Sequence, residues 1–192
     1  MKIIQLITLF LLIGFLRVYA VEYVKKENGI ILIGSKTAPF QQNIPFDLSI
    51  ELYSDGNNKQ HVIKFSIPVK TFYSFKSNSV VSFALKNGGI LKLKSIYHFY
   101  SNECSNACFP VSEKEIELII NGITCVKFDL LQYTGEGIKD VIVEELYKKS
   151  GWEKEPTAFR MRNYNIIKQI EKYYDDVNKE YDKLKKKNFV IK

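Results

Sequence analysis

The residues that most often carry enzyme chemistry are scarce in this chain. Its 192 residues include two His and three Cys. His61 follows a turn-forming stretch, His98 lies in a β-prone stretch, and neither belongs to a recognisable motif. Nucleophilic catalysis needs a base beside the nucleophile, and the Gly-x-Ser-x-Gly, His-Glu-x-x-His and phosphate-loop motifs are absent. The sequence therefore predicts no catalytic residue, no metal ligand and no cofactor site. An enzyme would need residues that converge only after folding.

The cysteines give the most specific chemical signal. Cys104 and Cys108 would be ~13 Å apart in an extended strand, whereas a disulfide allows only ~4.4 to 6.8 Å between Cα atoms. We therefore expect a turn or a helical coil between them, closed by a structural disulfide. A zinc site and a redox-active pair are the alternatives, although zinc sites normally show two close ligand pairs and redox pairs a two-residue spacer. Cys125 is expected to be a small buried apolar side chain.

An apolar run opens the chain and predicts export. Lys2 precedes the run from Ile3 to Leu16, and a small residue, Ala20, closes it. This is the pattern of a secretory signal peptide cleaved between Ala20 and Val21. The alternative is an uncleaved membrane anchor, but fourteen residues at about 1.5 Å rise span only ~21 Å of a ~30 Å hydrocarbon core. We expect a secreted or periplasmic protein without a transmembrane span after cleavage.

The charge of the chain is modestly positive. The formal net charge is +7, and removing Lys2 and Arg17 with the signal peptide leaves +5. A secreted chain rarely meets nucleic acid, so no nucleic-acid partner is expected. A basic cluster near the C-terminus either complements a helix macrodipole or makes a weak contact with an anionic lipid or polysaccharide surface. The cluster comprises Lys183, Lys185, Lys186 and Lys187.

Alternating hydrophobicity predicts a largely antiparallel sheet. Two β-prone runs flank Asn28-Gly29, which is a strong hairpin signal, and Asn87-Gly88 separates a second pair, Val80 to Leu85 and Ile90 to Tyr100. Residues 46–53 alternate as a half-buried strand with one wet face, and a return strand ends at Pro68. The aromatic loop between Val69 and Ser79 is expected to cover an open sheet end, with a ligand platform as the alternative.

Helix signals follow in the second half of the chain. Ser112 and Glu115 form a capping box that begins a short helix, and a β-branched strand follows Asn121-Gly122. A second helix is expected over Ile138 to Ser150. A long amphipathic helix is expected from Thr157 to about Lys187, which either docks on its own domain or pairs with another helix. Its apolar seam comprises Ile166, Ile170, Tyr173, Val177, Tyr181 and Leu184.

These elements predict an α+β fold. We expect an antiparallel β-sheet of about six or seven strands, a short helix after the central hairpins and a long C-terminal amphipathic helix. The expected organisation is a signal peptide over residues 1–20, an α+β domain over 21–152 and a C-terminal helical extension over 153–192 that docks on the domain.

The middle third of the chain resembles a loose group of small secreted proteins from Bacteroidetes-type bacteria. The resemblance lies in the strand-turn-strand from Val81 to Leu93, the helix start at Phe109 to Glu113 and the Gly-Ile-x-x-Val-x-Phe strand at Gly122 to Phe128. These motifs are structural, and the group has no settled activity, so the resemblance implies no catalytic residue.

The expected export, together with the lack of a recognisable catalytic or metal site in the sequence, favours a non-catalytic function. We expect a secreted or periplasmic binding or interaction module whose partner is an unknown protein or a component of the cell envelope. The alternative is an enzyme that acts on an envelope or extracellular polymer. Assembly through the last helix is a third hypothesis.

Overall fold

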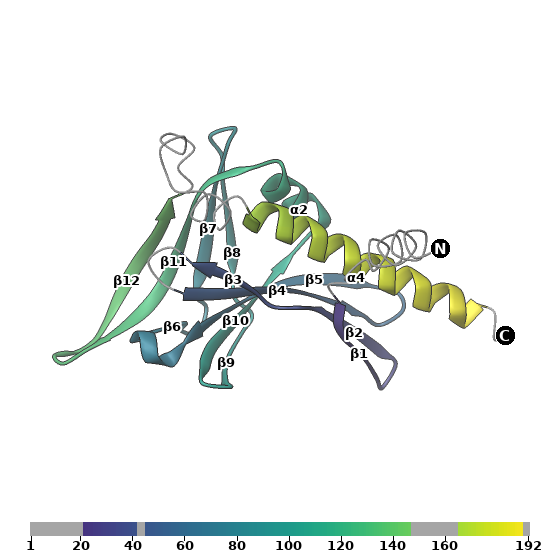
Figure 1. The fold of residues 1–192 in the computed structure, drawn as a ribbon, viewed down its shortest axis with the longest axis horizontal. Helices are drawn as coiled ribbons and strands as arrows, with labels where there is room; N and C mark the ends of the chain where they lie inside the picture. The colour runs from purple at the N-terminus through teal and green to yellow at the C-terminus, as the bar shows by residue number, and fades with distance from the viewer. Residues whose placement is uncertain (1–20, 42–44, 147–164, 190–192) are drawn as a thin grey trace, which may run out of the picture.

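Two antiparallel β-sheets and two α-helices make up the part of the chain that the structure describes (Figure 1). The computed structural model describes residues 21–41, 45–146 and 165–189. Sheet A has seven strands in the order β1-β2-β4-β5-β10-β9, with β3 also beside β4. Its strands are β1 (Val21–Glu27), β2 (Ile30–Ser35), β3 (Ala38–Gln41), β4 (Pro45–Ser54), β5 (Lys59–Pro68), β9 (Tyr97–Ser101) and β10 (Cys104–Val111).

Sheet B has five strands in the order β12-β11-β7-β8, with β6 also beside β11. Its strands are β6 (Tyr73–Ser74), β7 (Val80–Leu85), β8 (Ile90–Lys94), β11 (Ile123–Thr134) and β12 (Gly137–Leu146). A 3₁₀ turn, η1 (Val69–Thr71), precedes β6, and the helices are α2 (Glu113–Ile120) and α4 (Asn165–Phe189). The antiparallel α+β class is therefore confirmed, but the strands are divided between two sheets instead of one.

Aromatic packing joins the two sheets. In β4, the apolar face from Phe46 to Leu52 is buried, as the sequence pattern predicted. The ring of Phe46 stacks on Phe128 of β11 at 4.2 Å between centroids, and Phe65 of β5 meets Phe128 edge-on at 5.0 Å. Offset and edge-on pairs of this kind add to the stabilisation that area burial gives. The core therefore lies between sheets A and B.

Local turn and capping signals are confirmed. Asn28 and Gly29 both have positive φ (49° and 79°), and Glu27 pairs with Ile30 across the turn. At α2, the Ser112 hydroxyl accepts from the Glu115 backbone N–H, and the Glu115 carboxylate accepts from the Ser112 N–H at 2.8 Å. Ile116 of α2 is fully buried. These features depend on neighbouring residues, which is why the sequence predicts them well.

The expected long strand from Ile90 to Tyr100 is two strands in different sheets. β8 pairs with β7 in sheet B, whereas β9 pairs with β10 in sheet A. The chain crosses at Ser95 and Ile96, whose backbone N–H groups donate to the carbonyls of Ser79 and Cys108. Leu93 before the crossing is buried and Tyr97 after it is 62% exposed. A periodicity of two cannot reveal such a change of sheet.

The helix expected over residues 138–150 is wrong where the structure describes it. Residues 137–146 form β12, which pairs with β11 as a hairpin closed by Thr134 and Gly137. The segment is rich in β-branched residues, which favour a strand once a partner strand is present. Residues 147–150 lie outside the described part of the chain.

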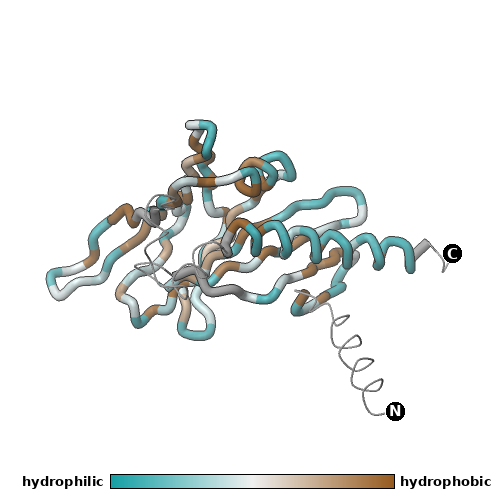
Figure 2. Tube along the Cα trace, turned by 45° about the horizontal axis from the view of Figure 1, so that its top comes forward, coloured by the Kyte–Doolittle hydropathy of each residue, from teal (hydrophilic) through white to brown (hydrophobic). Residues whose placement is uncertain are grey.

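Helix α4 packs across sheet A (Figure 1). It begins at Asn165, and the expected start at Thr157 lies outside the described residues. Ile170, Tyr173 and Val177 of the predicted seam are buried against β4 and β2, and Tyr181 and Leu184 are half-buried. Figure 2 shows α4 as mostly hydrophilic along its length, as expected for a helix with a narrow apolar seam. The side chain of Ile166 is not among those described.

The aromatic loop only partly behaves as expected. Phe75 is buried between the sheets and Tyr73 is half-buried, so these rings cover the core. Phe72, in contrast, is 66% exposed and has a φ of 62°, which is uncommon for a bulky residue. The loop therefore contributes both a core residue and an exposed ring.

Two expectations about the chain ends lie largely outside the described residues. Ala20 and the rest of the expected signal peptide are not described, and Val21 is the first residue of β1. Trp152, where the expected α+β domain ends, is also outside the described residues. Among the described helices, none combines the length and the apolar character that crossing a membrane requires.

Candidate functional site

The structure does not contain the expected disulfide between Cys104 and Cys108. Both residues lie in this strand, which pairs continuously with β5 from Cys104 to Val111, so no turn separates them. Four residues of extended strand span ~13 Å, too far for a disulfide. All three cysteines are free thiols. Cys125 is buried in β11, as predicted.

The two thiols of β10 are poor nucleophiles. Burial raises the pKa of Cys108 to about 11, and the nearby Glu51 carboxylate adds to the rise while Lys64 opposes it. Burial and the carboxylates of Asp47 and Glu103 also raise the pKa of Cys104. The thiolate is the reactive form, so both groups are largely inert at neutral pH. No cluster of three or more metal-ligating side chains occurs among residues 21–41, 45–146 and 165–189.

The outer face of sheet A holds a buried carboxylate. Glu51 of β4 points away from the aromatic core, yet it is only 5% exposed. Its carboxylate accepts hydrogen bonds from the hydroxyls of Tyr23 (2.7 Å) and Tyr53 (2.6 Å), and Lys64 of β5 lies 3.3 Å away. The sequence pattern predicted that this face would be wet, but here the polar side chains bury one another.

Burial and hydrogen bonding act on Glu51 in opposite directions. Burial alone would raise the pKa of the carboxyl, but the bonds from Tyr53 and Tyr23 and the charge of Lys64 outweigh it, so the pKa is lower than usual. The same cluster raises the pKa of both tyrosines, because burial and the adjacent carboxylate disfavour a phenolate. Glu51 therefore stays ionised and both phenols stay protonated at neutral pH.

A glycine makes room for one of these tyrosines. Gly34 of β2 lies between Tyr23 and Glu51 in the sheet, since it pairs with both residues. A Cβ atom at Gly34 would come within 2.2 Å of the Tyr23 ring. The ring thus lies over the bare backbone, and its hydroxyl reaches Glu51 one strand further. A side chain at Gly34 would displace Tyr23 and remove one hydrogen bond from the carboxylate.

A second polar network continues along the same face. Asn106 of β10 accepts from the Ser66 hydroxyl at 2.6 Å and donates to the Ser101 hydroxyl and the Cys104 carbonyl. Asn106 is 4% exposed, so these bonds satisfy an amide that would otherwise be costly to bury. On the outer face of sheet A, the buried side chains of Glu51 and Asn106 are therefore both hydrogen-bonded.

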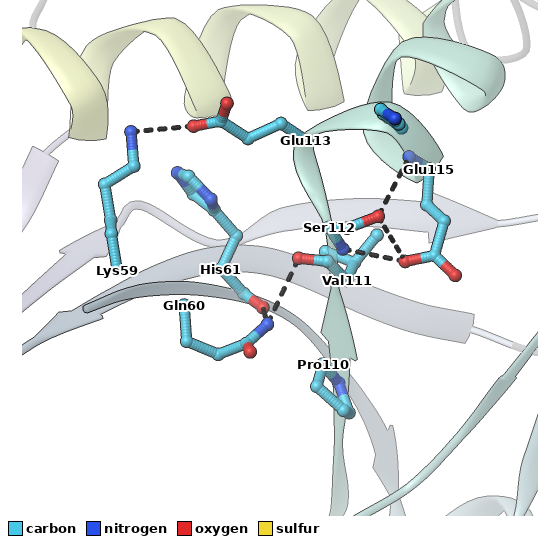
Figure 3. Close-up of a pocket in the computed structure, with 9 residues that line it drawn as sticks. Lys59, Gln60, His61, Pro110, Val111, Ser112, Glu113 and Glu115 are labelled. Atoms are coloured by element: carbon cyan, nitrogen blue, oxygen red, sulfur yellow. Dashed lines mark hydrogen bonds and ion pairs between the residues drawn. The ribbon is translucent and has the colours of Figure 1, made fainter.

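An open pocket of about 600 Å³ lies where β5, β10 and α2 meet (Figure 3). Its charged rim is fixed on one side by the ion pair between Lys59 and Glu113, at 2.8 Å. On the other side, the capping box pairs the backbone N–H groups of Ser112 and Glu115 with side-chain oxygens at the start of α2. The lining residues are Lys59, Gln60, His61, Pro110, Val111, Ser112, Glu113, Lys114 and Glu115.

His61 belongs to the contact between this pocket and α4. It is 2% exposed, its Nε2 lies 3.1 Å from the Asn178 side-chain oxygen, and its ring tilts against Tyr174 at 4.7 Å. Burial lowers the pKa of the imidazole, and the bond to Asn178 only partly opposes this. His61 therefore serves helix docking as a neutral ring. His98 lies in β9, the edge strand of sheet A, so the fold does not bring the two histidines together.

The basic residues near the C-terminus lie on the last turns of α4. Lys183 forms an ion pair with Glu180 at 3.1 Å, and Lys186 and Lys187 occupy the final turn, where positive charge complements the helix macrodipole. Lys185 is exposed beside them. This position accounts for the cluster, and contact with an anionic surface stays a prediction.

Sequence reasoning missed Glu51. Its place in an alternating strand marked it as outward-facing and therefore as solvated. The two tyrosines close to it in the structure offered a weak signal at best, because Tyr23 is 28 residues away and only strand pairing brings it near. In the structure, Glu51 binds Tyr23, Tyr53 and Lys64, and His61 binds Asn178.

Comparisons of the chain with protein-family models, curated proteins and solved structures found no match. The resemblance to small secreted bacterial proteins therefore stays a prediction. The role of the candidate site is therefore inferred from its geometry alone.

The free thiols give a first prediction. The intact mass of the non-reduced protein should be unchanged by a reductant, and alkylation under denaturing conditions should label all three cysteines. Before denaturation, Cys104 should react first, because Cys108 and Cys125 are buried. A mass lower by two hydrogens, mapped to Cys104 and Cys108, would show that β10 is not the continuous strand described above.

The Glu51 cluster predicts a pH-dependent stability. The pKa of Glu51 is lowered on folding, so its stabilisation is complete above the unfolded pKa of about 4.3 and is lost as the pH falls through the folded pKa. Glu51→Gln should lower the free energy of unfolding by about 1 to 3 kcal/mol at neutral pH, and the difference should shrink in acid. Urea titrations across this range measure it.

The exposed Glu117 of α2 provides the matched control for this measurement. Glu117→Gln should change the free energy of unfolding by less than about 0.5 kcal/mol at any pH. Equal stability of Glu51→Gln and the wild type at neutral pH would contradict a structural role for the carboxylate.

Proposed function

We propose that this protein is a secreted or periplasmic binding module without catalytic activity, and that its ligand contacts the pocket between β5, β10 and α2. The observation that carries the proposal is the state of the reactive groups. Glu51 is saturated by three donors, both thiols of β10 have raised pKa values and His61 is bound to Asn178. These residues stabilise the fold, which leaves surface recognition as the function that the geometry favours.

The pocket supports this proposal through its shape and its lining. It is concave and built on strands and a capped helix, so its polar groups are preorganised, which reduces the entropy lost on binding. Lys59 and Lys114 supply positive charge, Glu113 and Glu115 supply negative charge, and Gln60 supplies an amide. A polar envelope component that carries both charge signs, such as a peptide-bearing cell-wall fragment, is the ligand class that fits such a lining.

A panel of soluble cell-wall fragments tests the proposal by NMR titration of the exported protein. We expect chemical-shift changes that cluster at the pocket, with fragment masses unchanged after long incubation. Lys114→Glu should weaken binding by about fivefold or more, equivalent to about 1 kcal/mol. Lys92 is an exposed lysine on β8, away from the pocket, and Lys92→Glu should bind like the wild type. Cleaved or modified fragments would favour the enzyme alternative, and shifts confined to another surface would refute the pocket as the site.

A further inference from the structure

The edges of the two sheets differ in how they are protected from pairing with another chain. An exposed edge strand offers unpaired backbone groups, and natural proteins protect such edges with lysine, proline or very short strands. β1 carries Lys25 and Lys26, β8 carries Lys92 and Lys94, and β12 carries Lys139. The flanking strand β3 contains Pro39, and β6 has only two residues.

Strand β9 has none of these protections. Its sequence, Tyr-His-Phe-Tyr-Ser, contains no charged residue and no proline, and among the described strands it pairs only with β10. Tyr97 and Tyr100 are 62% and 55% exposed, and Ile96 just before the strand is 68% exposed. The exposed surface of β9 is thus aromatic and uncharged, on a chain whose formal net charge is +7.

We propose that a second copy of this chain adds to β9 in antiparallel fashion and continues sheet A across a two-fold axis. Pairing centred on Phe99 places Phe99 opposite its equivalent, Tyr97 opposite Ser101 and His98 opposite Tyr100. Each pair lies on one face of the joined sheet, as antiparallel pairing requires. This interaction surface is independent of the pocket and of the ligand proposed above.

The aromatic rings of β9 suit such a pairing. Within one chain, Tyr97 stacks on Phe99 at 5.2 Å on one face, and His98 meets Tyr100 edge-on at 5.1 Å on the other. A second copy would extend both ring contacts across the axis.

Charge selects β9 over the other edges for self-pairing. Antiparallel pairing of β8 centred on Lys92 would place two lysines directly opposite each other, which is destabilising. At β9 no charge opposes another. A five-residue strand pair buries less surface than the ~1,200 Å² of a stable interface, so the dimer should be weak and concentration-dependent.

Sedimentation velocity of the purified protein, over about 1 µM to 1 mM, tests the proposal. We expect the monomer to convert to a dimer as concentration rises, and Tyr97→Lys to raise the dissociation constant at least about tenfold by placing a charge on the pairing edge. Ile90→Lys is the matched control, since Ile90 is similarly exposed on β8, and it should dimerise like the wild type. Circular dichroism verifies that each variant is folded, and Tyr100→Lys replaces Tyr97→Lys if the latter fails to fold.

Hydrogen exchange supplies the second readout. The backbone amides of residues 97–101 should become more protected as the concentration rises, whereas those of β8 should not. A protein that stays monomeric over this range, or a dimer that Tyr97→Lys leaves intact, would overturn the proposal. Dimerisation with protection at another edge would also overturn it.

Discussion

One apolar face of sheet A must be covered along its whole length, and two different elements cover it. At one end of β4, Phe46 stacks on Phe128 of sheet B. Toward the other end, α4 takes over, where Tyr181 lies 3.0 Å from the Ser54 hydroxyl. The residues beneath both covers form one continuous core. Because a bare apolar face would be costly in water, neither sheet B nor α4 is dispensable to the fold.

On the opposite face of the same strands, the polar groups bind one another. Glu51, the two tyrosines that bind it and Lys64 form a closed set of donors and acceptors. A buried carboxylate in such a set is held in one state and cannot act as a proton carrier near neutral pH. Accessible polar groups of both charge signs line the pocket beside α2, and recognition is therefore the function that we propose. The edge of β9 is the separate surface that we propose for self-association.

The limits of sequence reasoning follow the range of each interaction. Asn28-Gly29 and the Ser112–Glu115 capping box act within four residues, and both were predicted correctly. The switch between sheets at Ser95 and the bond from Tyr23 to Glu51 depend on residues far along the chain, which no local pattern contains. Residues 137–146 pair with the adjacent strand β11, and there the helix prediction failed because β-branched residues favour a strand once a partner strand is present. The cysteines show the same limit, since their spacing could indicate a turn only until strand pairing fixed β10 as extended.

Native-state hydrogen exchange tests most directly whether α4 is part of the core. The account predicts that amides in the segment around Ile170 and Val177 open with a free energy close to that of β4 and β5, because the helix covers their apolar face. It also predicts that the last turn, which carries Lys186 and Lys187, exchanges faster. Exchange of the whole helix at rates typical of an unprotected peptide, with β4 and β5 still protected, would contradict the claim that this core has two necessary covers.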